Sequence, residues 1–298
     1  MALAMGKTVV VVDSTADLPE SIRDELGIHM VPLNVHFGLE IYKDQIDLDS
    51  NSFYQKLKTL PILPKTSQPS PGSFLDVYKQ VATPEDLIIS YHISGKVSGT
   101  IQSALMAKSL LPDYNIKIID SEGLSLHYGM QAIEIARKAL HGASFEEIKK
   151  HLEKVKQSIQ VCFTVETLEY LYKGGRLSRG SAIAGGLLDI KPIIKVDEKG
   201  ALVAVEKVRG REKSIRRLIE IVGEKGADLE SQTLGLIHGD DKATLDRVKE
   251  ELIQRYGCRN FLENYVGCAI GAHTGPGIIG ITFLNSDSPY KEFLQEGL

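Results

Sequence analysis

The first half of the chain contains four short runs of apolar, largely β-branched residues, and stretches of helical character separate them. The runs cover residues 8–12, 29–37, 87–92 and 116–119. Continuous apolar runs of this length are typical of strands buried on both faces. Helical segments between them are the connections that parallel strands need. The pattern predicts a three-layer α/β/α domain with a parallel sheet of about four strands over residues 1–158.

Helices of this first domain are expected between and after the strands. One begins at Pro19, the first helical position that proline favours. The others are expected at residues 52–60, 73–81, 99–110, 124–140 and 144–158. Ser144 followed by Glu147 resembles a capping box at the start of the last helix.

The second half has a different pattern. Strands are expected at residues 160–165, 191–196, 202–208, 233–238, 260–266 and 278–283, and helices at 166–173, 179–188, 212–224 and 242–256. Residues 197–200, Asp-Glu-Lys-Gly, join two of these strands as a tight hairpin, so the sheet is at least partly antiparallel. The pattern predicts a two-layer α/β domain with a mixed sheet of about six strands over residues 159–298.

Charge and cysteine content exclude several classes of protein. The 298 residues include 35 basic and 39 acidic side chains, a net charge of 35 − 39 = −4, which argues against non-specific binding to nucleic acid or anionic membranes. Three widely spaced cysteines form neither a disulfide framework nor a zinc pattern, which favours a reducing compartment. Residues 1–6 are too short for a signal sequence, and no apolar run has the length of a membrane span. A cytoplasmic protein without an integral membrane segment is expected.

Hydroxyl side chains follow two of the predicted strands. Ser98, Gly99 and Thr100 stand where a helix begins, and a helix N-terminus offers unpaired N–H groups to a carboxylate. The alternative is that Ser98 only caps this helix. Ser14 and Thr15 follow the first strand, at the sheet edge where ligands bind in such folds. The neighbouring Asp13 and Asp17 can cap the next helix instead, a role favoured for Asp17.

Two further segments carry candidate ligand-binding groups. Thr66 and Ser67 lie on a loop between helices that prolines hold extended, where hydroxyls face a ligand head group or cap the next helix. His273 and Thr274 lie within a glycine-rich loop, residues 271–277, that permits close approach to a ligand. A histidine there can donate a hydrogen bond to a carboxylate, or loop carbonyls can satisfy it.

A basic, glycine-rich segment at residues 173–181 suits contact with phosphate or with an acidic partner. Arg176 and Arg179 belong to it, and Arg209 after a later strand can add to the same face. The alternative is a helix that ends at Gly174, followed by a solvated loop.

Several of these segments resemble, in order and over nearly the whole chain, the DegV family of bacterial fatty-acid-binding proteins. The matching segments are residues 13–19 (DSTADLP), 66–70 (TSQPS), 93–100 (ISGKVSGT), 173–178 (KGGRLS), 191–194 (KPII), 207–210 (KVRG) and 271–277 (GAHTGPG). The resemblance implies a long-chain fatty acid bound between two domains, without a cofactor. It also implies a partner, an ATP-dependent fatty acid kinase that converts the bound carboxylate to an acyl phosphate.

The resemblance assigns carboxylate binding to Thr66, Ser98 and His273. Further head-group or cleft positions are Ser14, Thr15, Ser67, Gly99, Thr100 and Thr274, and partner contact is assigned to Arg176, Arg179 and Arg209. Residues 124–135 and 183–188 can supply apolar walls. His127 and Tyr128 are bulkier than the residues that the family often has there, so the resemblance does not define the pocket shape at this point.

Two other functions compete with a lipid carrier. A hydrolase would use Ser98 as nucleophile, His273 as base and Asp13 to orient it. However, no G-x-S-x-G, complete Walker A, G-x-G-x-x-G or H-E-x-x-H motif is present. A regulatory scaffold would use the basic segment but leave the hydroxyl and histidine groups without a role.

Overall fold

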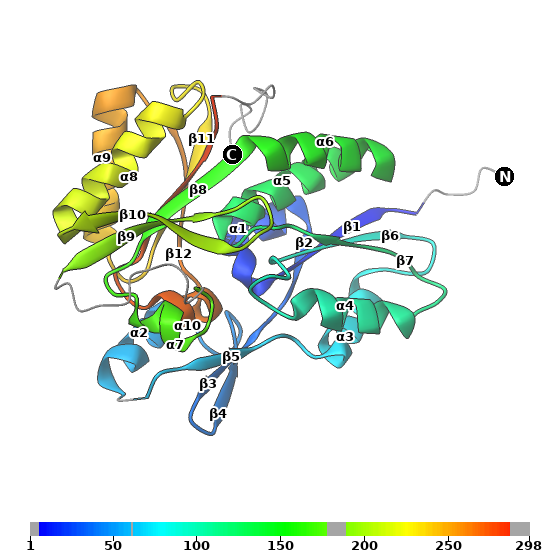
Figure 1. Cartoon of the computed structure of the whole chain (residues 1–298). Coiled ribbons are helices and arrows are strands. Elements are labelled where there is room, and N and C mark those ends of the chain that lie inside the picture. Colours follow the sequence, from blue (N-terminus) through cyan, green and yellow to red (C-terminus); the bar gives the residue numbers. More distant parts are fainter. Residues whose placement is uncertain (1–5, 61, 178–188, 287–298) are drawn as a thin grey trace.

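A computed structural model describes residues 6–60, 62–177 and 189–286, and these residues form three β-sheets (Figure 1). The first sheet is parallel, with strands in the order β2 (Ile28–Val31), β1 (Thr8–Asp13), β6 (Leu87–His92) and β7 (Asn115–Asp120). On one face lie α3 (Pro71–Val81) and α4 (Thr100–Ser109). On the other lie α1 (Glu20–Leu26), α5 (Leu126–Leu140) and α6 (Phe145–Ser158). The predicted parallel α/β/α arrangement is confirmed.

Strand β1 explains why these runs are apolar throughout. Val9 and Val11 pack with α3 and α4, whereas Val10 and Val12 pack on the side of α5. Successive side chains of a strand point to opposite faces, and here helices bury both faces. Every position of the strand therefore favours an apolar residue.

The second sheet is mixed and has six strands. Their order is β10 (Leu202–Arg209), β9 (Ile190–Val196), β8 (Ile159–Thr164), β13 (Ile279–Leu284), β11 (Thr233–His238) and β12 (Asn260–Tyr265). The β11–β12 pair is parallel, and the other pairs are antiparallel. The predicted hairpin joins β9 to β10, with Gly200 at a φ of 79°. The helices α8 (Arg211–Lys225) and α9 (Lys242–Tyr256) cover one face.

Helix α5 connects the two large sheets. It packs so closely on β11 that a Cβ on Gly235 would lie 2.7 Å from Met130 Sδ. A single hydrophobic cluster therefore contains side chains from β1, β6, α5, α6, β8 and β11. The chain passes directly from α6 to β8 at Ser158, and the division into two domains at this point stays a prediction.

A third, small sheet was not expected. It is antiparallel, in the order β4 (Glu40–Lys43), β3 (Asn34–Phe37) and β5 (Lys65–Ser67), and α2 (Ser50–Thr59) and α10 (Cys268–Thr274) pack against it. The single strand predicted over residues 29–37 is wrong. Pro32 interrupts it, because proline donates no backbone hydrogen bond, and the two halves enter different sheets.

Helix ends match the sequence patterns in part. The capping box of Ser144 and Glu147 at the start of α6 is confirmed. Pro19 is the cap residue before α1 rather than its first helical residue. Asp17 does not cap α1, because its carboxylate accepts hydrogen bonds from Gly267 N and Ser125 Oγ. The helix expected at residues 179–188 lies outside the described residues.

Candidate functional site

A cavity lies where the carboxyl ends of β1 and β6 meet β5, α10 and α7 (Glu169–Lys173). Most of the wall is apolar, with Ile93, Leu124, Phe163, Leu171, Leu202 and Ile270 among its residues. Its polar residues are Thr15, Thr66, Ser98, Arg176, His273 and Thr274.

Three of these polar residues also line a second, outer pocket. They are Thr66, Arg176 and His273, and the outer pocket adds Lys65 and Lys173. Half of the six polar residues of the cavity therefore lie at its border with the outer pocket. A ligand with an apolar tail and an anionic head would match this distribution.

His273 is the centre of this border. Its Nε2 lies 2.7 Å from Thr66 Oγ1, and its buried Nδ1 has no hydrogen-bond partner among the described residues. Burial and the nearby Arg176 cation lower the pKa of His273 to about 4, so the ring is neutral at pH 7. The expectation of a loop position is wrong, because His273 lies in the last turn of α10.

Thr66 is held by strand pairing. It lies on β5 opposite Val35 of β3, so the expected loop is a short strand. The adjacent Ser67 points to other groups, since its Oγ bonds with His36 Nε2 at 3.0 Å. Side chains alternate along a strand, which explains why Thr66 lines the cavity and Ser67 does not.

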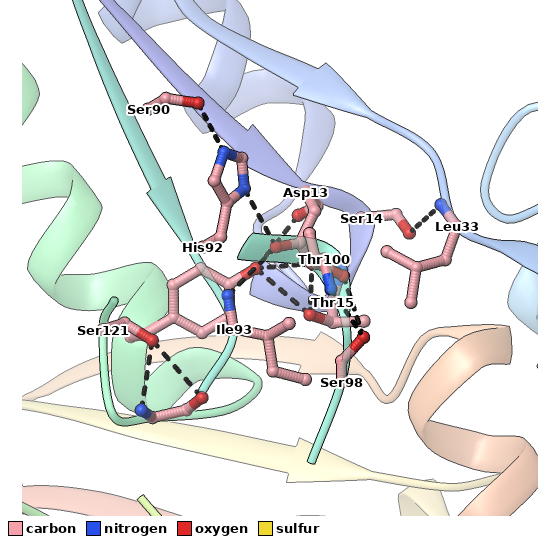
Figure 2. Close-up of polar contacts among 12 residues, drawn as sticks. Asp13, Ser14, Thr15, Leu33, Ser90, His92, Ile93, Ser98, Thr100 and Ser121 are labelled. Carbon is pink, nitrogen blue, oxygen red and sulfur yellow. Dashed lines mark hydrogen bonds and ion pairs between the residues drawn. The ribbon is translucent and has the colours of Figure 1, made fainter. Parts of the chain in front are cut away.

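Ser98 lies before α4 and reaches the cavity. Its Oγ is 2.8 Å from Thr100 Oγ1 and 3.4 Å from Thr100 N (Figure 2). The cap residue of α4 is Gly99, which has no side chain to bond the helix. Gly99 and Thr100 are not among the residues that line the cavity.

The Arg176 side chain lines the cavity, whereas the sequence predicted for it only contact with a partner. Its Nε donates to Val97 O at 3.1 Å and its Nη1 to Gly174 O at 2.6 Å. Burial lowers the pKa of this guanidinium below its ordinary value, but an arginine stays charged. No ion pair is found for it among the described residues. Arg176 thus brings a cation without a carboxylate partner to the border of the cavity.

The other predicted residues take different positions. Thr15 and Thr274 line the cavity, but Thr15 donates to Asp13 and Thr274 to Ile270 O. Ser14 turns away and donates to Asp44. Arg209 is exposed at the end of β10, and Arg179 lies outside the described residues, as do residues 183–188.

A buried polar network fixes the carboxyl ends of β1 and β6 (Figure 2). Asp13 Oδ2 lies 3.1 Å from His92 Nδ1, and His92 Nε2 lies 2.5 Å from Ser90 Oγ. Burial opposes ionisation of Asp13, but hydrogen bonds and charge from His92 hold its pKa below its ordinary value. The order Ser, His, Asp resembles a hydrolase triad. However, Ser90 and His92 are fully buried and line no described pocket, so the network is structural.

The hydrolase alternative used other residues and is not supported by their contacts. Asp13 bonds with His92, His273 with Thr66, and Ser98 with Thr100. The three side chains therefore form no relay. In the described part of the chain, no group of three or more His, Cys, Asp or Glu side chains could hold a metal ion. No described helix has the length and apolar composition of a membrane span.

His127 and Tyr128 are not among the residues that line the cavity. The Tyr128 hydroxyl donates to Asp13 O at 3.1 Å and to Asp13 Oδ1 at 3.0 Å. His127 lines a separate groove beside Lys156 and Lys195. The Tyr128 hydroxyl also lies 3.2 Å from Oγ1 of Thr15, which lines the cavity, so Tyr128 supports the wall from behind.

The fold and this site define a class of α/β proteins that enclose a mainly apolar cavity with a hydroxyl, an imidazole and a guanidinium at its border. The family model described as an uncharacterised protein of the DegV family matches residues 7–286. The chain belongs to the DegV family.

Relatives of known sequence and structure agree with this assignment. Protein DegV of Bacillus subtilis is 38% identical over 273 residues, which are 91% of this chain and 97% of that protein. A DegV domain-containing protein of Caldanaerobacter subterraneus is 36% identical, over 94% of this chain and 99% of the relative.

Two solved structures are similar over nearly their full lengths. The fatty acid binding protein DegV from Bacillus subtilis has a TM-score of 0.83 at 36% identity, covering 94% of this chain and 99% of that one. A DegV family protein from Thermus thermophilus, described by its fatty acid binding, has a TM-score of 0.84 at 32% identity, covering 93% and 98%.

Proposed function

We propose that this protein binds a long-chain fatty acid, with the acyl tail in the cavity and the carboxylate at Thr66, Ser98 and His273. The observation that carries this proposal is the hydrogen-bonded pair of Thr66 and His273 beside the Arg176 cation, at the border of a mainly apolar cavity. The similar proteins described as fatty acid binding support the ligand class.

The tail supplies most of the binding free energy. Each buried methylene contributes about 0.8 kcal/mol, so a long acyl chain in an apolar cavity needs few polar contacts. The polar groups then serve to select a carboxylate and fix its position, because a buried carboxylate without partners is unfavourable.

The neutral His273 ring explains how a carboxylate is accepted. Nδ1 has no acceptor near it, so we assign the ring hydrogen to Nε2, which donates to Thr66 Oγ1. The hydroxyl hydrogen of Thr66 is then available to a carboxylate oxygen. Arg176 supplies the opposite charge, and hydrogen bonds between ionised groups are about twice as strong as neutral ones.

The outer pocket suits presentation to a partner. It borders the proposed carboxylate position and carries Lys65 and Lys173 beside Arg176. An ATP-dependent fatty acid kinase could approach from this side and transfer a phosphoryl group to the carboxylate, with exposed Arg209 in its contact surface. Positioning and charge neutralisation provide most of the acceleration in such transfers. This chain then acts as a carrier, and the kinase performs the chemistry.

The proposal is tested by mass spectrometry of an organic extract of the purified protein. We expect a long-chain fatty acid at about one per chain. An empty extract, together with no binding of added oleic acid in calorimetry, would contradict the proposal. Activated ester hydrolysis that disappears in Ser98→Ala would support the hydrolase instead.

A further inference from the structure

Helix α10 carries much of the site although it is very short. Four residues that line the cavity lie on it, Ala269, Ile270, His273 and Thr274, and the helix has 7 residues in all. Helices shorter than about 12 residues are marginal in water without tertiary contacts. The position of His273 therefore depends on what holds α10 in place.

Asp44, directly after β4, binds the N-terminus of this helix. Its Oδ1 accepts a hydrogen bond from Cys268 N at 3.0 Å, and its Oδ2 accepts one from Ala269 N at 3.3 Å. The side chain is fully buried. A carboxylate is favourable at this end of a helix because the first N–H groups are unpaired and carry a partial positive charge.

The same carboxylate also binds the segment after β1. Ser14 Oγ donates to Asp44 Oδ2 at 2.7 Å, and Asp44 N donates to Leu33 O at 2.9 Å. Leu33 and Thr15, the neighbour of Ser14, both line the cavity. Asp44 thus joins three separate segments that form the wall of the site.

Contacts on the side and at the end of α10 leave little freedom for it to move alone. A Cβ on Gly271 would lie 2.7 Å from the Tyr54 hydroxyl oxygen, so this face of the helix is tightly packed. At the other end, His273 bonds with Thr66. A displacement of the N-terminus would therefore shift His273 relative to Thr66.

We propose that Asp44 is a positioning residue for the head-group site: it holds the N-terminus of α10 so that His273 keeps its hydrogen bond to Thr66. This inference rests on the proposed function for its binding readout. Asp44 does not contact the ligand in this proposal. The preference of the site for a carboxylate head group depends on the buried Asp44 side chain, which lies outside the cavity.

Asp44→Asn tests this role. Whichever carboxylate oxygen the amide nitrogen of asparagine replaces, its N–H₂ group faces a backbone N–H donor, that of Cys268 or that of Ala269. One hydrogen bond from the helix is therefore lost. We expect the Kd for oleic acid to rise about tenfold, while the Kd for oleyl alcohol changes by less than about twofold. Asp47→Asn is the matched control, because Asp47 is exposed three residues away and bonds with Lys43 N.

A double-mutant cycle separates positioning from general support of the fold. If Asp44 acts through His273, adding Asp44→Asn to His273→Ala should cause no further loss of oleic acid affinity. The proposal would be overturned if the fold-losses in oleic acid affinity of the two single variants multiplied in the double variant. Equal losses of affinity for oleic acid and oleyl alcohol would overturn it as well.

A ligand-free measurement distinguishes this inference from the proposed function. NMR titration of the His273 ring in the wild type should show a midpoint near pH 4, because burial and the Arg176 cation lower its pKa to about 4. In Asp44→Asn the displaced ring should gain solvent contact, and its pKa should rise toward the ordinary value. An unchanged titration would overturn the inference. A wild type that binds no fatty acid, combined with a shifted titration in the variant, would refute the proposed function alone.

Ser14→Ala provides a second variant if Asp44→Asn does not fold. It removes the hydroxyl that donates to Asp44 and leaves both helix contacts of Asp44 in place. We expect a smaller change in the same direction, selective for the acid over the alcohol. Equal effects on both ligands would count against a positioning role.

Discussion

His273 Nε2 and Thr66 Oγ1 lie 2.7 Å apart, although 207 positions separate them in the chain. The contact joins the end of α10 to the small sheet at the border of the cavity. Both groups are polar, largely enclosed and free of other side-chain partners in the described structure, so a ligand group can join the pair. The experiments below ask what this pair and its surroundings do.

His273→Ala should weaken binding of a fatty acid but not of the matching alcohol. The substitution removes the donor to Thr66 and leaves the apolar wall intact, so the Kd for oleic acid should rise about tenfold. Calorimetry with oleic acid and oleyl alcohol measures both. His141→Ala, at an exposed histidine after α5, is the control. Unchanged acid binding would make His273 structural.

Gly174→Ala should disturb His273 through steric contact. A Cβ at this position would lie 2.2 Å from His273 Nδ1 and 2.9 Å from Tyr170 O. We expect weaker oleic acid binding and a lower melting temperature, because the backbone oxygen cannot move freely. Gly72→Ala is the matched control, since its Cβ would meet no atom closer than 3.5 Å. Equal behaviour of the two variants would show that the close approach is not needed.

Arg176→Gln should reduce the affinity for oleic acid. It should also make that affinity less sensitive to salt concentration. The guanidinium lacks a carboxylate partner in the described structure and lines the cavity, so its charge is available to the ligand. We expect a loss of about tenfold or more for oleic acid, and little change for oleyl alcohol. The control is Arg255→Gln, on the exposed face of α9. Equal losses for acid and alcohol would indicate that Arg176 only supports the fold.

Arg209→Ala separates partner contact from ligand binding. Arg209 is exposed at the end of β10 and lines neither pocket of the site. We expect normal fatty acid affinity and slower acyl phosphate formation with a fatty acid kinase of a DegV-containing bacterium. Turnover at the wild-type rate would remove Arg209 from the proposed contact surface.

Asp17→Asn should stabilise the protein increasingly as pH rises. Burial, together with the nearby Asp44 charge, raises the pKa of Asp17 well above its ordinary value. A raised pKa means that the folded state holds the proton more tightly. Stability is therefore lost as pH increases from about 3.9, the unfolded value, through the folded pKa. An amide can still accept from Gly267 N and donate to Ser125 Oγ.

Urea unfolding of the wild type and Asp17→Asn between pH 4 and pH 8 measures this effect. The difference in free energy of unfolding should grow with pH in favour of the variant, because asparagine has no ionised form to bury. Comparing the two proteins cancels the contribution of other titrating groups. A difference that does not depend on pH would show that Asp17 is not protonated in the folded state.

Local sequence patterns determined the main elements of this protein. The apolar run of β1 and the capping box of Ser144 and Glu147 needed no distant information, because strand burial and helix capping depend on neighbouring residues. The hairpin at Gly200 follows from the same local rules. These features were sufficient to predict the parallel first sheet and the mixed second sheet.

The tertiary structure decided the small sheet and the details of the site. Strand β3 lies within a predicted strand, but its local pattern could not show that it pairs in a separate sheet, and β5 has only 3 residues and gains stability from that pairing. Asp44 gave no sequence signal, because its partners Cys268 and Ala269 are more than 200 positions away. The sequence thus predicted Thr66 and His273 as site residues from a family resemblance, whereas burial and long-range hydrogen bonds determined how the two side chains meet.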